Sequence, residues 1–113
     1  MFISLKYFQH TGKANTQVCW YSYGGKEYET KDFSWIVSDG ISQLLNNNGK
    51  FNPPDTAIKI AVAHDGNGPY YSIIAKTQWG LVPGKANRRQ AWFPYGGKEY
   101  TTLNFDWIVI DAI

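Results

Sequence analysis

Residues 12–37 read GKANTQVCWYSYGGKEYETKDFSWIV, and residues 84–109 read GKANRRQAWFPYGGKEYTTLNFDWIV. The two stretches align without a gap, with Gly12 on Gly84 and Val37 on Val109, and they share 16 of 26 positions. Self-similarity of this extent indicates a duplicated structural unit. Because the offset between the copies is more than half the length of the chain, the stretch from about 42 to 72 occurs only once. The sequence therefore predicts two copies of one unit with a single unpaired insert.

Length and composition favour one globular domain over residues 1–113. Apolar residues make up 43% of the chain and charged residues 18%, which is too apolar for a disordered segment. Aromatic residues reach 17%, more than a core of this size needs. We therefore expect some aromatic rings to lie on the surface, where such rings commonly bind a ligand.

Local patterning favours short β-strands throughout, because β-branched and aromatic residues outweigh any helical periodicity. Asn-Gly within 65–68 predicts a hairpin turn, and the Gly-Gly pairs at 24–25 and 96–97 predict two more turns. The segment 41–45 could form one helical turn after Ser38 or Asp39, followed by a loop over 46–54. The strands are expected at 2–8, 18–23, 33–37, 57–64, 70–76, 90–95 and 105–110. The fold class predicted is all-β.

Charge and cysteine content exclude several classes of protein. The net charge of +2 is too small for the basic stripe of a nucleic-acid binder. Cys19 is the only cysteine, so no intramolecular disulfide or Cys/His zinc site can form, and its replacement by Ala91 in the second copy suits a small buried side chain. The N-terminal residues lack the apolar run of a signal peptide or membrane span, so we expect a cytoplasmic protein without membrane insertion. Release of the protein from the cell without a signal peptide would leave no mark in the composition.

The string LVPGKANRRQAWFPYGGKEY at 81–100 resembles the signature of the DM9 repeat family, a Pro-Gly-Lys turn followed by an aromatic strand and Tyr-Gly-Gly-Lys-Glu. PPDTAIKIAVAHDGNGPYYSIIAKTQWG at 53–80 is similar to the hairpin segment that precedes that turn in the family. By this resemblance, residues 42–113 form a full DM9-like repeat that includes the insert 42–72, and residues 1–41 form a partial one. The family implies an all-β tandem fold with pseudo-two-fold symmetry, and some of its members are mannose-binding lectins.

The resemblance also implies ligand-binding residues. In the mannose-binding members a hairpin Asp and the Lys of the Pro-Gly-Lys turn hold sugar hydroxyls, which here correspond to Asp65 and Lys85. A carboxylate that accepts from two hydroxyls beside an ammonium that donates to one suits a diol. His64 lies next to the hairpin Asp, and Lys13 repeats the Lys of the turn. An aromatic side chain could also stack on the apolar face of the sugar ring, and the candidates are Trp79, Tyr71 and Trp92.

Each of these residues also has a plainer interpretation. Asp65 could cap its own Gly-rich turn, His64 could be a structural residue at a strand end, and the lysines could be solvated turn residues. Glu27 and Glu99 could form a glycosidase pair, but equivalent positions in a repeat have equivalent surroundings, whereas an acid and a nucleophile need different ones. A structural turn is the better reading for both, and we expect no enzyme and no catalytic residue. The recurring tryptophans, Trp20/Trp92 and Trp35/Trp107, are read as core or interface residues.

These features together predict a lectin for mannose-containing glycans that needs no cofactor or metal. The alternative is a structural or protein-interaction module in which the Asp/Lys pair is architectural. We expect one strong site per chain, because the first copy has no hairpin Asp to accompany Lys13, and we expect removal of Lys85 to leave folding nearly unchanged. A homodimer is also expected, because single monosaccharide sites bind weakly and gain avidity when linked.

Overall fold

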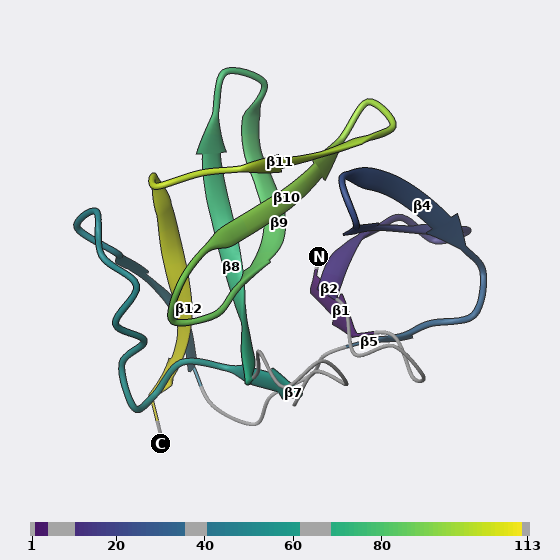
Figure 1. Ribbon diagram of the computed structural model, residues 1–113. Helices are drawn as coiled ribbons and strands as arrows, with labels where there is room; N and C mark the ends of the chain where they lie inside the picture. Colours follow the sequence, from purple (N-terminus) through teal and green to yellow (C-terminus); the bar gives the residue numbers. More distant parts are fainter. Residues whose placement is uncertain (1, 5–10, 36–40, 62–68, 112–113) are drawn as a thin grey trace.

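The strands form one continuous antiparallel sheet (Figure 1). The structure is a computed structural model, which describes residues 2–4, 11–35, 41–61 and 69–111, and every regular element in these ranges is a strand. Along the sheet the order is β5-β1-β2-β3-β4-β11-β10-β9-β8-β12-β6, and β7 pairs with β8. In chain order the strands are β1 (Phe2–Ser4), β2 (Thr11–Ala14), β3 (Cys19–Tyr23), β4 (Lys26–Thr30), β5 (Ser34–Trp35), β6 (Ile41–Asn46), β7 (Lys59–Ala61), β8 (Tyr70–Thr77), β9 (Gly80–Ala86), β10 (Ala91–Tyr95), β11 (Lys98–Thr101) and β12 (Phe105–Asp111). The all-β class predicted from the sequence is confirmed.

The two copies of the repeated sequence meet at the junction of β4 with β11. The first copy supplies the purple and blue strands of Figure 1, and the second copy supplies most of the green and yellow ones. Lys26 of β4 lies opposite Lys98 of β11 in the antiparallel register. Strands β3 and β10 cover the same positions of the repeat, since both their first and their last residues are equivalent in the alignment of the copies. The junction therefore places the duplicated Gly-Gly-Lys-Glu motifs side by side.

The helical turn predicted over 41–45 is wrong, because this segment is strand β6. It pairs with β12 along its whole length, from Ile41 opposite Asp111 to Asn46 opposite Asp106. A strand alongside an otherwise open edge gains a full ladder of backbone hydrogen bonds, which a single helical turn cannot offer. Leu44 and Leu45 of this edge strand are half exposed, so the ladder with β12 contributes more to holding the strand than burial of these two side chains.

The predicted Gly-Gly turns are confirmed. Gly25 and Gly97 adopt φ angles of 85° and 84°, a region that suits glycine far better than other residues. Gly12 and Gly84 are required for a different reason, namely close approach of neighbouring strands. A Cβ atom on either residue would collide with the backbone carbonyl oxygen of Trp20 or Trp92 across the ladder. The first predicted hairpin, over 65–68, lies outside the described residues.

The core lies under the second copy. Its main cluster combines buried side chains of β8, β9, β10 and β12, with Phe51 and Ala57 of the insert packed against it. Trp107 is 2% exposed, whereas its repeat equivalent Trp35 is 45% exposed. Burial in the core, one of the two roles expected for the recurring tryptophans, therefore holds for Trp107 and not for Trp35.

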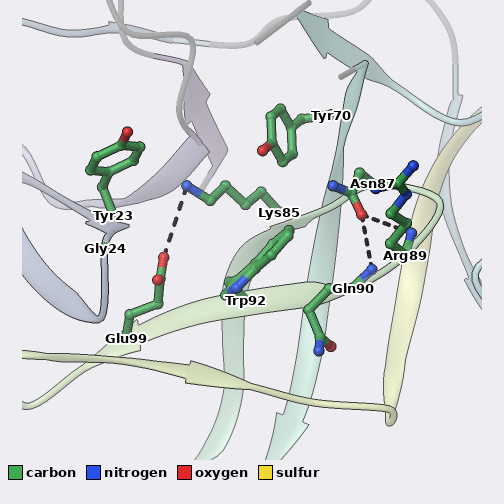
Figure 2. Close-up of a pocket in the computed structure, with 9 residues that line it drawn as sticks. All are labelled: Tyr23, Gly24, Tyr70, Lys85, Asn87, Arg89, Gln90, Trp92 and Glu99. Carbon is green, nitrogen blue, oxygen red and sulfur yellow. Dashed lines mark hydrogen bonds and ion pairs between the residues drawn. The ribbon is translucent and has the colours of Figure 1, made fainter. Parts of the chain in front are cut away.

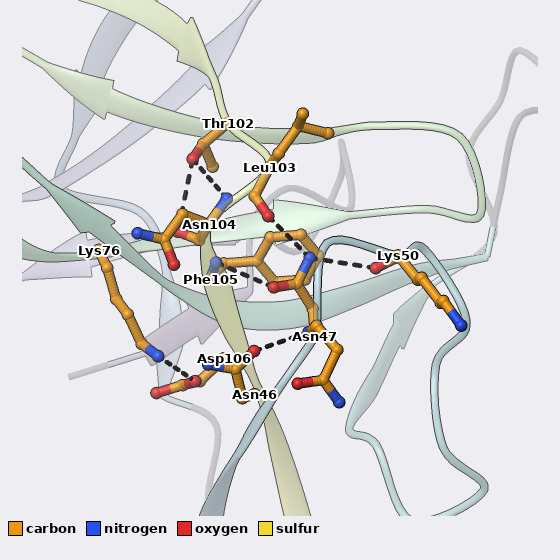
Figure 3. A network of polar contacts seen from close by, with 10 residues as sticks. Asn46, Asn47, Lys50, Lys76, Thr102, Leu103, Asn104, Phe105 and Asp106 are labelled. Carbon is orange, nitrogen blue, oxygen red and sulfur yellow. Dashed lines mark hydrogen bonds and ion pairs between the residues drawn. The ribbon is translucent and has the colours of Figure 1, made fainter.

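Asn47 fixes the start of the insert loop against β12 (Figure 3). Its side chain donates to the carbonyl oxygens of Lys50, at 3.1 Å, and Leu103, at 2.9 Å. It also accepts a hydrogen bond from the backbone N–H of Phe105 at 3.3 Å. Because Asn47 is only 6% exposed, these three bonds replace lost water contacts and anchor the loop that carries Phe51.

Candidate functional site

The candidate site is built around the ammonium of Lys85. Strand β9 pairs with β10 so that Lys85 lies opposite Trp92, and paired residues project from the same face of a sheet. Lys85 is 4% exposed, and its Nζ atom donates to the carbonyl oxygen of Ser22 at 2.7 Å. The same atom lies 3.9 Å from Oε2 of Glu99. A buried ammonium of this kind is held in place by charge and hydrogen bonding together.

Three aromatic rings surround this ammonium. Its Nζ atom lies 5.6 Å from the ring centroid of Tyr70, 5.7 Å from that of Tyr23 and 5.9 Å from that of Trp92. Each distance is within the range of a cation–π interaction. Tyr70 and Trp92 also contact one another edge to face, with centroids 6.0 Å apart. The rings therefore provide both an electrostatic setting for Lys85 and an apolar wall.

The surrounding side chains form an open pocket of about 470 Å³ (Figure 2). Asn87 shapes one rim, because its side-chain oxygen accepts hydrogen bonds of 2.8 Å from the backbone N–H groups of Arg89 and Gln90. The volume lies within the usual range of sites for small ligands. The lining residues are Tyr23, Gly24, Tyr70, Lys85, Asn87, Arg89, Gln90, Trp92 and Glu99. The pocket thus combines an apolar wall with polar groups of both charges.

The Lys85 contacts have counterparts at the equivalent lysine of the first copy, Lys13. Lys13 donates to the carbonyl oxygen of Pro94 at 3.2 Å, as Lys85 does to that of Ser22. Its Nζ atom lies 3.7 Å from Oε2 of Glu27 and 4.8 Å from the ring centroid of Tyr95. In each case the lysine of one copy reaches the carbonyl group of the other copy.

Glu27 and Glu99 also form hydrogen bonds to the opposite copy, as the two lysines do. Oε1 of Glu99 accepts from the backbone N–H of Gly25, and Oε1 of Glu27 accepts from that of Gly97, both at 3.0 Å. The backbone N–H groups of the glutamates donate in turn to the carbonyl oxygens of Gly97 and Gly25. The interpretation of both glutamates as structural residues of the Gly-Gly-Lys-Glu motifs agrees with these bonds. That the amides belong to the opposite copy was not foreseen.

The two lysines nevertheless differ in their surroundings. The side chain of Lys13 is 26% exposed, against 5% for Lys85. Tyr70 and Trp92 flank the ammonium of Lys85, whereas Lys13 contacts the ring of Tyr95. The buried ammonium with its aromatic wall is therefore a feature of Lys85 rather than of the duplicated motif.

The structure places the other predicted site residues as follows. Asp65 and His64 lie outside the described residues. Tyr71 is buried in the core with its ring 5.8 Å from that of Trp107, so it is the preceding residue, Tyr70, that reaches the pocket. Trp79 lines a different pocket. Of the three aromatic candidates, only Trp92 lies beside Lys85.

Sequence reasoning did not find several lining residues, among them Tyr23, Arg89 and Gln90. Tyr23 comes from the first copy, and no local pattern indicates that it reaches the pocket of the second. The expectation that removing Lys85 would leave folding nearly unchanged is also not supported by its burial and its bond to Ser22. The register of β9 against β10 places Lys85 and Trp92 on one face, and this register cannot be read from the sequence alone.

Cys19, the one cysteine of the sequence, does not offer a reactive thiol in the folded chain. Burial raises the pKa of the Cys19 thiol to about 12, so the sulfur stays protonated near neutral pH. Cys19 is fully buried, which agrees with its interpretation as a small core side chain. Among the described residues, no group of three His, Cys, Asp or Glu side chains could hold a metal ion. No helix in the same ranges is long and apolar enough to cross a membrane.

Comparison with models of known protein families and with curated proteins finds no match. The resemblance to the DM9 repeat family therefore rests on the motifs quoted above.

Proposed function

We propose that the chain is a carbohydrate-binding protein that holds a mannose-type glycan, without covalent chemistry, in the Lys85 pocket. The observation that carries the proposal is the buried ammonium of Lys85 beside the carboxylate of Glu99, under the rings of Tyr70 and Trp92. Neighbouring sugar hydroxyls both donate and accept, so an ammonium and a carboxylate side by side suit a diol. The rings offer contact to the C–H face of the sugar. The motif resemblance adds Asp65 as a further acceptor.

Hydrolysis of the bound sugar is not part of this proposal. Glu27 and Glu99 are the two carboxylates that could suggest it, and each accepts one backbone N–H bond and faces one lysine. A glycosidase needs one carboxyl group with a raised pKa and one that stays ionised. Matching surroundings do not create that difference, so binding is the better proposal.

One observation favours a second candidate, a structural module in which Lys85 is architectural. Its Nζ atom donates to the carbonyl oxygen of Ser22 in the other copy, and its side chain is 5% exposed. A lysine that ties the copies together needs no ligand to account for its position. A substitution of Lys85 would not distinguish the two candidates, because it would weaken folding and binding together.

Trp92 and its repeat equivalent Trp20 provide a matched test. Both are half-buried and lie opposite a lysine in the same register, Trp92 with Lys85 and Trp20 with Lys13. In calorimetric titration with methyl α-mannoside, Trp92→Leu should bind about two- to tenfold more weakly, since an aromatic contact contributes about 0.5–1.5 kcal/mol. Trp20→Leu should bind like the parent.

Absence of mannoside binding by the parent chain would favour the structural module. Equal losses in the two variants would show that the effect comes from folding rather than from the pocket. A binding ratio near one per chain is expected, because Lys85 is buried beside the ring of Tyr70, whereas the side chain of Lys13 is more exposed to water. If the chain forms a homodimer, the two sites of the dimer should raise the avidity for a multivalent glycan.

A further inference from the structure

We infer that the chain carries a second ligand site, around Trp79, for a neutral saccharide ring of the all-equatorial, β-linked type. A pocket of about 310 Å³ lies between the turn that joins β8 to β9 and the strands β10 and β11. Its walls are aromatic and its rim is polar. The lining residues are Lys76, Thr77, Gln78, Trp79, Phe93, Tyr100, Thr101 and Thr102.

This site lies on the opposite side of the β10–β11 ladder from the Lys85 pocket. Successive residues of a strand project to opposite faces, so Phe93 points away from the face that carries Trp92. Tyr100 lies opposite Phe93 in the register, and their rings stack with centroids 5.5 Å apart. The two pockets have no lining residue in common. A ligand in one pocket therefore leaves the other accessible.

The indole of Trp79 is held in position before any ligand arrives. It stacks on Tyr95 with centroids 4.5 Å apart and an angle of 12° between the rings, and it lies 5.0 Å from the ring of Tyr100. The backbone N–H of Trp79 donates to Oγ1 of Thr77, which itself donates to the carbonyl oxygen of Gly80. Despite these contacts Trp79 is 40% exposed. A rigid, partly exposed indole loses little conformational entropy when a ligand stacks on it.

The chemistry of the rim favours a neutral ligand that carries hydroxyls. The Lys76 ammonium is paired with the carboxylate of Asp106 at 2.9 Å, so the site offers no uncompensated charge to attract an anion. Gln78 and Thr101 are exposed at the rim and supply an amide and a hydroxyl. A β-linked all-equatorial pyranose presents flat C–H faces to an aromatic wall and its hydroxyls to such a rim. An axial hydroxyl, as in mannose, would interrupt one of those faces.

The test is a titration of the chain with cellobiose, followed through the indole N–H signals of its five tryptophans by NMR. The Trp79 signal, assigned by its absence in Trp79→Phe, should shift in a saturable way, while the Trp92 signal stays unchanged. Trp79→Ala should weaken cellobiose binding at least tenfold, and Trp79→Phe should bind with intermediate affinity. The control is Leu81→Ala, since Leu81 is 67% exposed, lies on the same hairpin and does not line the pocket.

The inference is overturned if the Trp79 signal does not respond to cellobiose, or if Leu81→Ala loses as much affinity as Trp79→Ala. Saturable binding of a proline-rich peptide at Trp79 in place of cellobiose would also overturn it, since such peptides dock on aromatic grooves. The test is independent of the mannose proposal, whose own readout is the calorimetric titration of the Trp92 and Trp20 variants with methyl α-mannoside. Either proposal can fail while the other stands.

Discussion

The asymmetry between Lys85 and Lys13 gives the most discriminating stability prediction. Lys85→Met removes a hydrogen bond from a charged donor to the Ser22 carbonyl group and breaks a buried ion pair. A bond to a charged group contributes about 1.5–3 kcal/mol, and breaking a buried pair costs about 3–5 kcal/mol. In the variant, Glu99 still accepts the hydrogen bond from the Gly25 amide, so its carboxylate is not left without any partner. The expected loss in free energy of unfolding is therefore about 3 kcal/mol, the lower end of the range for breaking a buried ion pair.

Lys13→Met makes the corresponding change at a site whose side chain is 26% exposed. Water can replace the lost contacts there, so the expected cost is about 1 kcal/mol. Urea denaturation followed by tryptophan fluorescence gives both free energies of unfolding. Combining Lys85→Met with Glu99→Gln should recover part of the loss, because the second change removes the carboxylate left without its partner. Equal costs for the two lysines would refute the reasoning from burial.

Three further predictions concern single positions. Gly84→Ala should destabilise the protein by more than about 2 kcal/mol, measured as a lowered midpoint of urea unfolding, because a Cβ would collide with the Trp92 carbonyl oxygen; a neutral effect would mean that the strands can separate. Asn47→Ala should lower the free energy of unfolding by about 2–3 kcal/mol in the same assay, since it removes two hydrogen bonds donated by the side chain and the acceptor of the Phe105 amide. A loss below about 0.5 kcal/mol would argue against the role of Asn47 in anchoring the loop. Cys19, whose pKa burial raises to about 12 from an ordinary value of 9.0, should resist a thiol reagent at pH 8 until the chain unfolds, and labelling of the folded protein at the rate of a small free thiol would contradict this. Because the raised pKa belongs to the folded state, its contribution to stability is intact below pH 9 and is lost as the pH rises toward 12.

Much of the sheet could be predicted from the sequence, because strands rich in β-branched and aromatic residues carry a local signal. Strands β8, β10 and β12 were predicted to within one or two positions of their ends. Strands β4 and β11, which contain Lys-Glu-Tyr, were missed because nothing local shows that Glu27 and Glu99 bond to backbone amides across the junction between the copies. The segment of β6 was predicted as a helical turn because nothing local shows that β12 offers it a free edge.

The candidate site could be predicted only in part, for a similar reason. The Pro-Gly-Lys motif singled out Lys85, and the alternation of side chains accounts for Trp92 beside it. The choice between Tyr70 and Tyr71 depends on strand register, which adjacent and chemically similar residues do not reveal. The Ser22 carbonyl group is far from Lys85 in sequence, so no local pattern could identify it as the partner of the ammonium.

The exchange of lysine and glutamate contacts resembles the interface of a symmetric homodimer enclosed within one chain. In such an interface residue i meets residue j and residue j meets residue i, so a single surface must complement itself. A substitution in one Gly-Gly-Lys-Glu motif then alters a contact made by the opposite motif, and both must remain compatible. This mutual constraint offers a physical reason why the stretches 23–28 and 95–100 are identical, while the positions between Asn15 and Trp20 and between Asn87 and Trp92 differ throughout.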